Sequence, residues 1–273
     1  MSFFVQVQDE QVPALGLGTW QLTGPGCRRV VEQALEIGYR HIDTAQTYGN
    51  EDQIGQALRS NMVVDRDELF VTTKLANRNH APQYVLASTD DSLRRLGIGY
   101  VDLLLVHWPV ELDSLPATLE AMVRLRDDGK VRHVGVSNFT PSQVELALQH
   151  GPIFCNQVEY HPFLAQPQQL ALARERGLLL TAYAPLARGQ VADDPGLADI
   201  GRRRGKTPAQ VALRWLVEQE AVSAVPKASS RDHLQENFTI FDFELSDDER
   251  EEISALDRGE RLFDPPFAPA WER

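Results

Sequence analysis

A glycine, a short strand, an aspartate and a tyrosine follow one another in the stretch Gly38-Tyr39-Arg40-His41-Ile42-Asp43-Thr44-Ala45-Gln46-Thr47-Tyr48-Gly49-Asn50-Glu51. Apolar residues at helical spacing precede Gly38, which predicts a helix that ends at this glycine. A short strand is expected from His41 to Ala45, and it brings Asp43 to its carboxyl end. Tyr48 follows five residues after Asp43, on a loop that is flanked by glycine, and a second helix begins after this loop. An aspartate and a tyrosine placed in this way fit either an acid–base site or a capped turn with a surface tyrosine.

Strand-like and helix-like segments alternate along the whole chain. The expected strands are Leu15–Trp20, His41–Ala45, Leu69–Leu75, Val101–Trp108, Val131–Asn138, Cys155–His161, Leu178–Pro185 and Val222–Lys227. Periodic segments between them predict helices that include Glu51–Arg59, Pro82–Leu96, Leu115–Asp128, Pro141–Gln149, Gln166–Arg176 and Pro208–Glu218. Short apolar strands are typical of parallel sheets that are buried on both faces. Eight such β-α units in about 250 residues predict a TIM-type (β/α)8 barrel of the α/β class.

The two ends of the chain add smaller elements to this barrel. Alternating residues from Phe3 to Leu15 predict an N-terminal hairpin. After Ser246, a capped helix and then a proline-rich tail, Asp264 to Trp271, are expected to lie over the barrel. No linker divides residues 1–273, so one domain is expected. The alternative, a doubly wound sheet, is disfavoured because Gly16-Leu17-Gly18-Thr19 lacks the third glycine of a dinucleotide fingerprint.

Composition limits the classes of function. The 273 residues are 42% hydrophobic and 24% charged, which is typical of a globular protein, and the formal net charge is −12. A negative chain repels phosphates, so nucleic acid and anionic membranes are not expected partners. The two cysteines, Cys27 and Cys155, lie far apart without metal-ligand spacing, which favours a reduced, cytoplasmic setting. No apolar run approaches the length that crosses a membrane.

Ionisable side chains lie at or near the carboxyl ends of three neighbouring expected strands: Asp43 on the second, Lys74 on the third and His107 on the fourth. Because strand carboxyl ends share one face of a barrel, these side chains should surround one spot, with Tyr48 above it. Singly, each can have a purely structural role, since Asp43 can cap a turn, Lys74 can extend along apolar surface and His107 can be a core histidine. Together they are harder to account for by packing, because a buried lysine is costly without a partner such as Asp43.

This set suits proton transfer to a carbonyl oxygen. A free tyrosine has a pKa of about 10 and is a poor donor near neutrality. An ammonium about 4 Å away contributes about 4 kcal/mol at an effective dielectric constant of about 20, which would lower the pKa of Tyr48 by up to about three units. Asp43 would keep Lys74 charged, and a neutral His107 would orient the substrate oxygen.

At this point the chain resembles the aldo-keto reductases, and the resemblance spans nearly its whole length. The blocks that carry it are Gly38–Ala45 with Glu51 and Ile54-Gly55, Gly129–Phe139, Val225-Pro226-Lys227 with Glu236-Asn237, Leu103–Pro109 and Asn156–His161. The resemblance implies a (β/α)8 barrel that reduces carbonyl compounds by hydride transfer from C4 of a nicotinamide, without a metal. It implies four catalytic residues: Asp43, Tyr48, Lys74 and His107.

The resemblance also implies a cofactor site of NADPH type. Its residues would be Gly18, Thr19, Trp20, Asp43, Ser137, Asn138, Gln157, Tyr183, Leu186, Arg188, Lys227, Ser229, Ser230, His233, Glu236 and Asn237. Ser137, Asn138 and Gln157 would hold the carboxamide, and Tyr183 would stack on the ring. The three polar residues could also cap strand ends, and Tyr183 could also pack inside the barrel.

The phosphate end departs from the family pattern. The family usually has Ser or Thr after the lysine and Arg six residues beyond it, whereas this chain has Ala228 and His233. Histidine titrates near neutrality and lacks the arginine fork, so a 2′-phosphate should bind more weakly, unless Arg231 compensates. NADPH is therefore expected to be preferred and NADH tolerated.

A substrate pocket of Trp20, Tyr48, His107 and Trp108 is expected, with short loops around it. In this the chain is similar to the compact prokaryotic diketo-gluconate and methylglyoxal reductases, which implies small aldehydes, dicarbonyls, keto-sugars or keto esters as substrates. A monomer is expected, because no long exposed apolar stripe indicates an obligate dimer. Two rivals remain. Lys74 could form a Schiff base in a class I aldolase, or the chain could be a non-catalytic, cofactor-binding relative.

Overall fold

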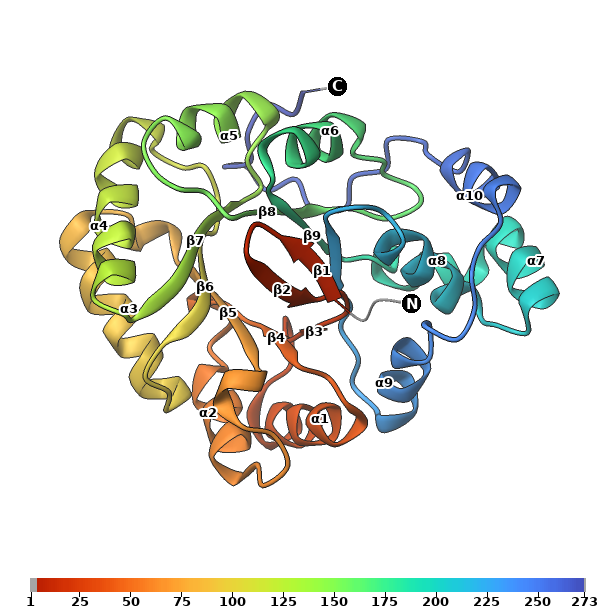
Figure 1. Ribbon diagram of the computed structural model, residues 1–273, viewed down its shortest axis with the longest axis horizontal. Coiled ribbons are helices and arrows are strands. Elements are labelled where there is room, and N and C mark those ends of the chain that lie inside the picture. The colour runs from red at the N-terminus through yellow and green to blue at the C-terminus, as the bar shows by residue number, and fades with distance from the viewer. Residues whose placement is uncertain (1–3, 273) are drawn as a thin grey trace.

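A closed sheet of parallel strands forms the centre of the chain in the computed structural model, which describes residues 4–272 (Figure 1). The strands follow one another in chain order: β3 (Leu17–Gly18), β4 (His41–Asp43), β5 (Phe70–Leu75), β6 (Val101–Val106), β7 (Val131–Ser137), β8 (Cys155–Glu159), β9 (Leu179–Tyr183) and β10 (Val222–Val225). A parallel bridge between Leu15 and Ala224 joins the first strand to the last. The expected (β/α)8 barrel is confirmed.

Gly18 allows the barrel to close. Its backbone N–H donates to the carbonyl oxygen of Pro226 at 3.0 Å. A Cβ at this position would lie 2.5 Å from the carbonyl oxygen of Val225, which is closer than any side chain tolerates. A glycine is therefore required where β3 meets β10.

Helices surround the sheet (Figure 1). They are α1 (Gly24–Ile37), α2 (Glu51–Ser60), α3 (Pro82–Leu96), α4 (Leu115–Asp127), α5 (Pro141–Leu148), α6 (Pro167–Arg176), α7 (Pro195–Arg204), α8 (Pro208–Val217), α9 (Arg231–Phe238) and α10 (Asp247–Ser254). Short 3-10 turns lie at η1 (Gln46–Tyr48), η2 (Arg66–Glu68), η3 (Asn77–Asn79), η4 (Leu112–Ser114) and η5 (Ala187–Asp193). Capping boxes at Thr140, Thr207 and Ser246 begin α5, α8 and α10, and Gly38 ends α1 with a positive φ of 124°.

An antiparallel hairpin of β1 (Phe4–Val7) and β2 (Glu10–Pro13) covers one end of the barrel, as the red ribbon in Figure 1 shows. The expected first residue of this hairpin, Phe3, lies outside the described residues. The inward side chains of the hairpin join one apolar cluster with residues that lie mostly near the amino ends of the strands: Val5, Val7, Val12, Ala14, Phe70, Leu103, Leu105, Phe154, Cys155 and Leu179. The hairpin therefore closes the amino end, and the carboxyl ends of the strands are left for the site.

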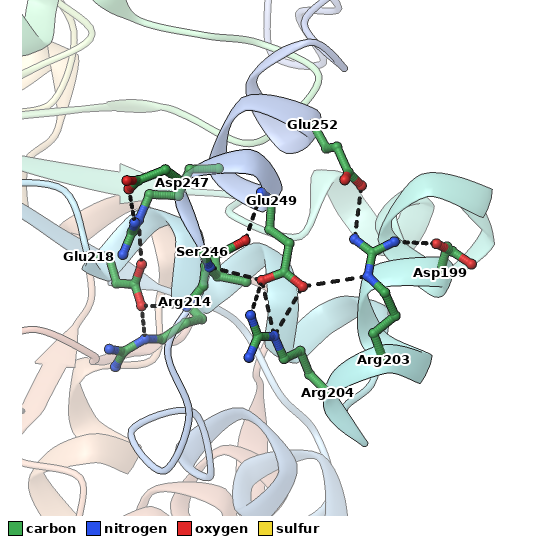
Figure 2. Close-up of polar contacts among 11 residues, drawn as sticks. Asp199, Arg203, Arg204, Arg214, Glu218, Ser246, Asp247, Glu249 and Glu252 are labelled. Atoms are coloured by element: carbon green, nitrogen blue, oxygen red, sulfur yellow. Dashed lines mark hydrogen bonds and ion pairs between the residues drawn. The ribbon is translucent and has the colours of Figure 1, made fainter.

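The C-terminal segments take two different positions. Helix α10 packs on the outer helices α7 and α8, where Glu249 lies between Arg203 and Arg204 (Figure 2). The tail instead reaches the strand ends, because Phe267 and Trp271 both contact the ring of Trp108. The expected position over the barrel therefore holds for the tail, and the helix lies on its outside.

The strands are shorter than their apolar patterns suggested. β6 ends at Val106 and β8 at Glu159, so His107 and His161 lie just beyond the ladder. Helix α7, which no expected segment covered, lies between β9 and α8. Within residues 4–272, no helix is long and apolar enough to cross a membrane.

Candidate active site

Asp43 and Lys74 form a buried ion pair at the carboxyl ends of β4 and β5. The Lys74 ammonium donates to Asp43 Oδ1 at 2.6 Å and to the carbonyl oxygen of Thr44 at 2.9 Å. Burial disfavours a charge on Lys74, but Asp43 and Tyr48 together outweigh this effect and raise the pKa of Lys74 above its ordinary value. The amine is therefore a fixed ammonium.

Both oxygens of the Asp43 carboxylate have partners. Oδ2 accepts a hydrogen bond from Gln157 Nε2 at 2.7 Å, across the barrel from β8. The carbonyl oxygen of Asp43 accepts from the amide and the hydroxyl of Thr19, at 3.0 and 2.9 Å. Asp43 is thus held from three sides, as a buried carboxylate requires.

Tyr48 ends the turn η1 and lies above this pair. The Lys74 Nζ atom is 5.1 Å from the centre of the Tyr48 ring, and the His107 ring is 5.8 Å from it, edge to face at 73°. Burial of the phenol raises the pKa of Tyr48, while the charge of Lys74 and a hydrogen bond with it act to lower the pKa. The expected net lowering of the pKa of Tyr48 is wrong, because the loss of water around the phenolate outweighs the ammonium.

His107 follows β6 as a neutral imidazole. Burial, together with the nearby charges of Lys74 and His80, lowers the pKa of His107 to about 3. Its Nδ1 lies 3.4 Å from the hydroxyl of Thr47, on the turn that carries Tyr48. A neutral ring can exchange hydrogen bonds with a substrate oxygen without adding a charge.

Hydroxyl and amide groups from β7, β8 and β9 lie beside Asp43. The Tyr183 hydroxyl donates to Asn138 Oδ1 at 2.7 Å, and Asn138 Nδ2 donates to Ser137 Oγ at 3.1 Å and to the carbonyl oxygen of His107 at 3.0 Å. Ser137 in turn donates to the carbonyl oxygen of Gln157 at 2.9 Å. Asn138 has a φ of 64°, a conformation that few residues other than glycine and asparagine adopt and that often marks functional sites. This donor and acceptor set fits a flat carboxamide.

The loop after β9 carries Leu186 and Arg188. Three non-glycine residues here, Ala184, Ala187 and Arg188, have φ angles between 46° and 54°. The Arg188 guanidinium lies over the ring of Trp20 at 5.8 Å. The strained loop therefore brings a permanent cation to the mouth of the barrel.

The expected phosphate-binding residues lie between β10 and α9. Lys227 and Ser229 are exposed, and Ser230 caps α9 by accepting from the backbone N–H of His233 at 3.2 Å. Arg231, which could have compensated for His233, instead pairs with Glu36 at 2.6 Å.

Glu236 and Asn237, the two residues expected to contact the adenine of the cofactor, make contacts within the protein. The Glu236 carboxylate accepts from the hydroxyl of Thr207 at 2.6 Å, and the side chain of Asn237 is buried.

The tail forms an aromatic wall that sequence reasoning missed. Trp20, which is 38% exposed, meets Phe263 edge to face at 5.3 Å, and Trp108 meets Phe267 at 5.4 Å. Glu159, which accepts hydrogen bonds from two backbone N–H groups of this tail, was not predicted as a site residue either. The signal was present, because Glu159 is an acidic residue at the end of a buried strand, as Asp43 is.

Comparisons with known proteins identify the family of this chain. The model of the aldo/keto reductase family matches residues 14–258. The methylglyoxal reductase of Escherichia coli (strain K12) is 38% identical over 269 residues, which are 96% of each chain. A crystal structure described as that of a candidate 2,5-diketo-D-gluconic acid reductase B covers 100% of this chain and 98% of that chain, with a TM-score of 0.96 and 43% identity.

A third comparison includes a cofactor. The structure of an aldo-keto reductase from Bombyx mori in complex with NADP covers 96% of this chain and 95% of that chain, with a TM-score of 0.88 and 33% identity. The matches to the family model, to the relatives and to the solved structures each cover most of the chain. This chain belongs to the aldo/keto reductase family.

Proposed function

We propose that this chain reduces small aldehydes, dicarbonyls, keto-sugars or keto esters to alcohols with a nicotinamide cofactor, and that Tyr48 is the proton donor. The observation that carries this proposal is the buried ion pair of Lys74 and Asp43 beside the Tyr48 ring. Burial keeps the phenol protonated near neutrality, and the ammonium stabilises the phenolate that forms when the proton leaves. His107 orients the substrate oxygen. The bound nicotinamide supplies the hydride.

The chain's own residues fit such a cofactor. Ser137, Asn138 and Gln157 offer hydroxyl and amide groups to a carboxamide, and the ring of Tyr183 offers a stacking surface beside them. The cation of Lys227 and the capped N-terminus of α9 suit a phosphate group. The NADP complex of the Bombyx mori relative supports the same cofactor class here.

NADPH is the preferred cofactor in this proposal, and NADH is tolerated. His233 is exposed at the start of α9 and Ala228 lacks a hydroxyl. A 2′-phosphate therefore binds more weakly here than it would to an arginine, whose guanidinium can donate two hydrogen bonds to it. Affinities for both cofactors test the preference, and equal or tighter binding of NADH would overturn it.

The proposed substrate class is based on the aromatic side chains around the candidate active site. Aromatic rings gather here: Trp20 is exposed and meets Phe263, Tyr48 meets His107, and the buried Trp108 contacts Phe267. Such rings suit compact carbonyl compounds. The names of the methylglyoxal and 2,5-diketo-gluconic acid reductase relatives support dicarbonyls and keto-sugars. Oxidation of NADPH over a substrate panel tests this class, and activity confined to bulky steroid ketones would exclude it.

A Schiff-base aldolase is disfavoured, because such an enzyme needs a neutral amine and Asp43 holds Lys74 as an ammonium. Borohydride trapping of a substrate on Lys74 would reverse this judgement. A non-catalytic relative would have no use for the buried pair.

Tyr48→Phe tests the proposed function against both rivals. General acid catalysis contributes about 10²–10⁴ in rate, so kcat should fall by about a thousandfold while the Kd of NADPH stays unchanged. Tyr84→Phe is the matched control, since Tyr84 is 54% exposed on α3. Turnover that is equal in both variants would refute the proton-donor role.

The proposal includes that the protein is a monomer and that it acts in the cytoplasm. Cys27 and Cys155 are both buried free thiols, and burial raises the pKa of Cys27 to about 11. Such thiols suit a reducing compartment. Apart from the adjacent Met62 and Val63, the exposed large apolar residues of the described chain come from separate segments, which supports a monomer: Phe4, Trp20, Met62, Val63, Tyr84 and Phe267.

A further inference from the structure

One fully buried carboxylate holds the start of the C-terminal tail. Glu159, at the end of β8, accepts the backbone N–H of Leu262 at 2.7 Å on Oε1 and that of Phe263 at 3.0 Å on Oε2. His161 Nε2 lies 3.1 Å from Oε1, and the Arg261 guanidinium lies 3.9 Å from Oε2. Two backbone N–H groups therefore donate to one side chain, His161 Nε2 lies within hydrogen-bond distance of it, and Arg261 lies at ion-pair distance. Hydrogen bonds to a charged acceptor are stronger than neutral ones.

The tail has no regular secondary structure where it meets Glu159. Residues 261–263 lie outside the helices and strands, so no ladder or helical bond fixes their amides. The carboxylate takes the place of such a ladder. A backbone held in this way has a defined position even though its own conformation is irregular.

The segment held by Glu159 reaches both sides of the candidate active site. The Phe263 ring meets Trp20 at 5.3 Å and Tyr183 at 5.5 Å, edge to face in both cases. Arg261 stacks on Trp271 at 3.6 Å, and the rings of Trp271 and Trp108 are 6.3 Å apart. The tail thus contacts both Tyr183, which is proposed to carry the nicotinamide, and Trp108, which is proposed to line the carbonyl site.

We propose that Glu159 is a positioning residue, which sets the affinity for carbonyl substrates that carry an apolar or aromatic substituent. It does so by fixing the amides of Leu262 and Phe263, so that the Phe263 ring stands between Trp20 and Tyr183. Both carboxylate oxygens are needed, because each accepts from a different backbone N–H. The inference rests on the proposed function only in taking this pocket as the carbonyl site.

Glu159→Gln tests the inference, because it keeps the volume and replaces one acceptor oxygen with a donor that faces an N–H. The KM for phenylglyoxal should rise about tenfold while kcat changes by less than about threefold, since the lost contact binds substrate and does not transfer the proton. The KM for methylglyoxal, which has no aromatic ring, should change by less than about threefold. Glu260→Gln is the control, since Glu260 lies next in sequence to Arg261 and pairs with an exposed Arg258.

A double-mutant cycle separates positioning from a general loss of structure. Phe263→Ala should raise the KM for phenylglyoxal in the wild-type background and have little further effect in Glu159→Gln, because the ring has already left its place. An undiminished effect of Phe263→Ala in Glu159→Gln, or an unchanged KM in Glu159→Gln, would overturn the inference. If Glu159→Gln does not fold, Glu159→Asp keeps the buried charge but shortens its reach, and the same KM pattern is expected of it.

A readout without turnover keeps this inference distinct from the proposed function. Trypsin cleaves after arginine, and Arg261 is largely buried while the tail is held. Cleavage at Arg261 should be faster in Glu159→Gln than in the wild type and unchanged in Tyr48→Phe. Equal cleavage in Glu159→Gln and wild type would reject the role of Glu159, whereas full turnover in Tyr48→Phe would reject the proposed function alone.

Discussion

Lys74 and Asp43 lie 2.6 Å apart with side chains that are only 1% and 4% exposed. Lys130 and Asp90 form a pair of the same residue types at the same distance, but with side chains 38% and 54% exposed. The residue types and the distance are the same in both pairs, so a comparison of the two shows what burial and the additional hydrogen bonds of Lys74 and Asp43 contribute.

Asp43→Asn should destabilise the chain strongly. Loss of one partner from a buried pair leaves the other charge uncompensated and costs about 3–5 kcal/mol, so the free energy of unfolding should fall by about 3 kcal/mol. Urea denaturation at pH 7 measures this change. Asp90→Asn, the matched control, should cost less than about 1 kcal/mol, since exposed pairs contribute little. Equal losses in the two variants would contradict a buried, charged pair.

His107 should make the fold less stable in mild acid. Its pKa is about 3 in the folded chain and about 6.5 in an unfolded one, so the unfolded state binds a proton first as the pH falls. The free energy of unfolding therefore decreases as the pH falls below about 6.5 and continues to do so until about pH 3, by up to about 1.4 kcal/mol per pH unit.

His107→Asn should remove this contribution, and the slope of the free energy of unfolding between pH 5 and 6 should fall by about 1 kcal/mol per pH unit. Urea titrations at several pH values measure the slope. His41, whose pKa burial lowers to about 4, keeps its own contribution in both proteins. Identical slopes would show that His107 is protonated in the fold.

The proposed function implies that His233, on α9, limits the affinity for NADPH. His233→Arg should tighten NADPH binding by about tenfold, because a charge-assisted hydrogen bond to a phosphate contributes about 1.5–3 kcal/mol. NADH, which lacks the 2′-phosphate, should bind as before. Fluorescence titration of both cofactors measures the two affinities. His150→Arg, at an exposed histidine after α5, controls for the added charge, and a gain shared by NADH or by His150→Arg would contradict a 2′-phosphate contact.

The barrel and the central ion pair were predictable from sequence because each is encoded locally. Apolar runs that end in Asp43 or Lys74 locate both the strand and the ionisable group at its end. The direction of the shift in the pKa of Tyr48 was not predictable, because the shift depends on how far the packed side chains exclude water from the phenol. Phe263 could not be placed either, since its position depends on the carboxylate of Glu159, 104 residues earlier in the chain.

Glu249 should contribute to stability through its charge. Its two carboxylate oxygens each lie 3.0 Å from Arg204 Nε, one of them also accepts from Arg204 Nη2 at 2.6 Å, and the pair joins α10 to α7 (Figure 2). The Arg204 guanidinium lowers the pKa of Glu249 to about 2. The shift corresponds to about 3 kcal/mol, which solvent screening of the partly exposed arginine reduces to about 1–2 kcal/mol.

Glu249→Gln should therefore lower the free energy of unfolding by about 1–2 kcal/mol at pH 7. Glutamine can still complete the capping box with Ser246, so the variant removes the charge and keeps the cap. The folded pKa lies below the unfolded one, so the wild-type advantage is complete above about pH 4.5 and disappears as the pH falls toward about 2. Urea titrations at pH 7 and pH 3.5 measure this difference in the free energy of unfolding.

Glu252→Gln is the control, because Glu252 is a more exposed partner of Arg203, and it should cost less than about 0.5 kcal/mol. A deficit in Glu249→Gln that is as large at pH 3.5 as at pH 7 would assign the role of Glu249 to packing.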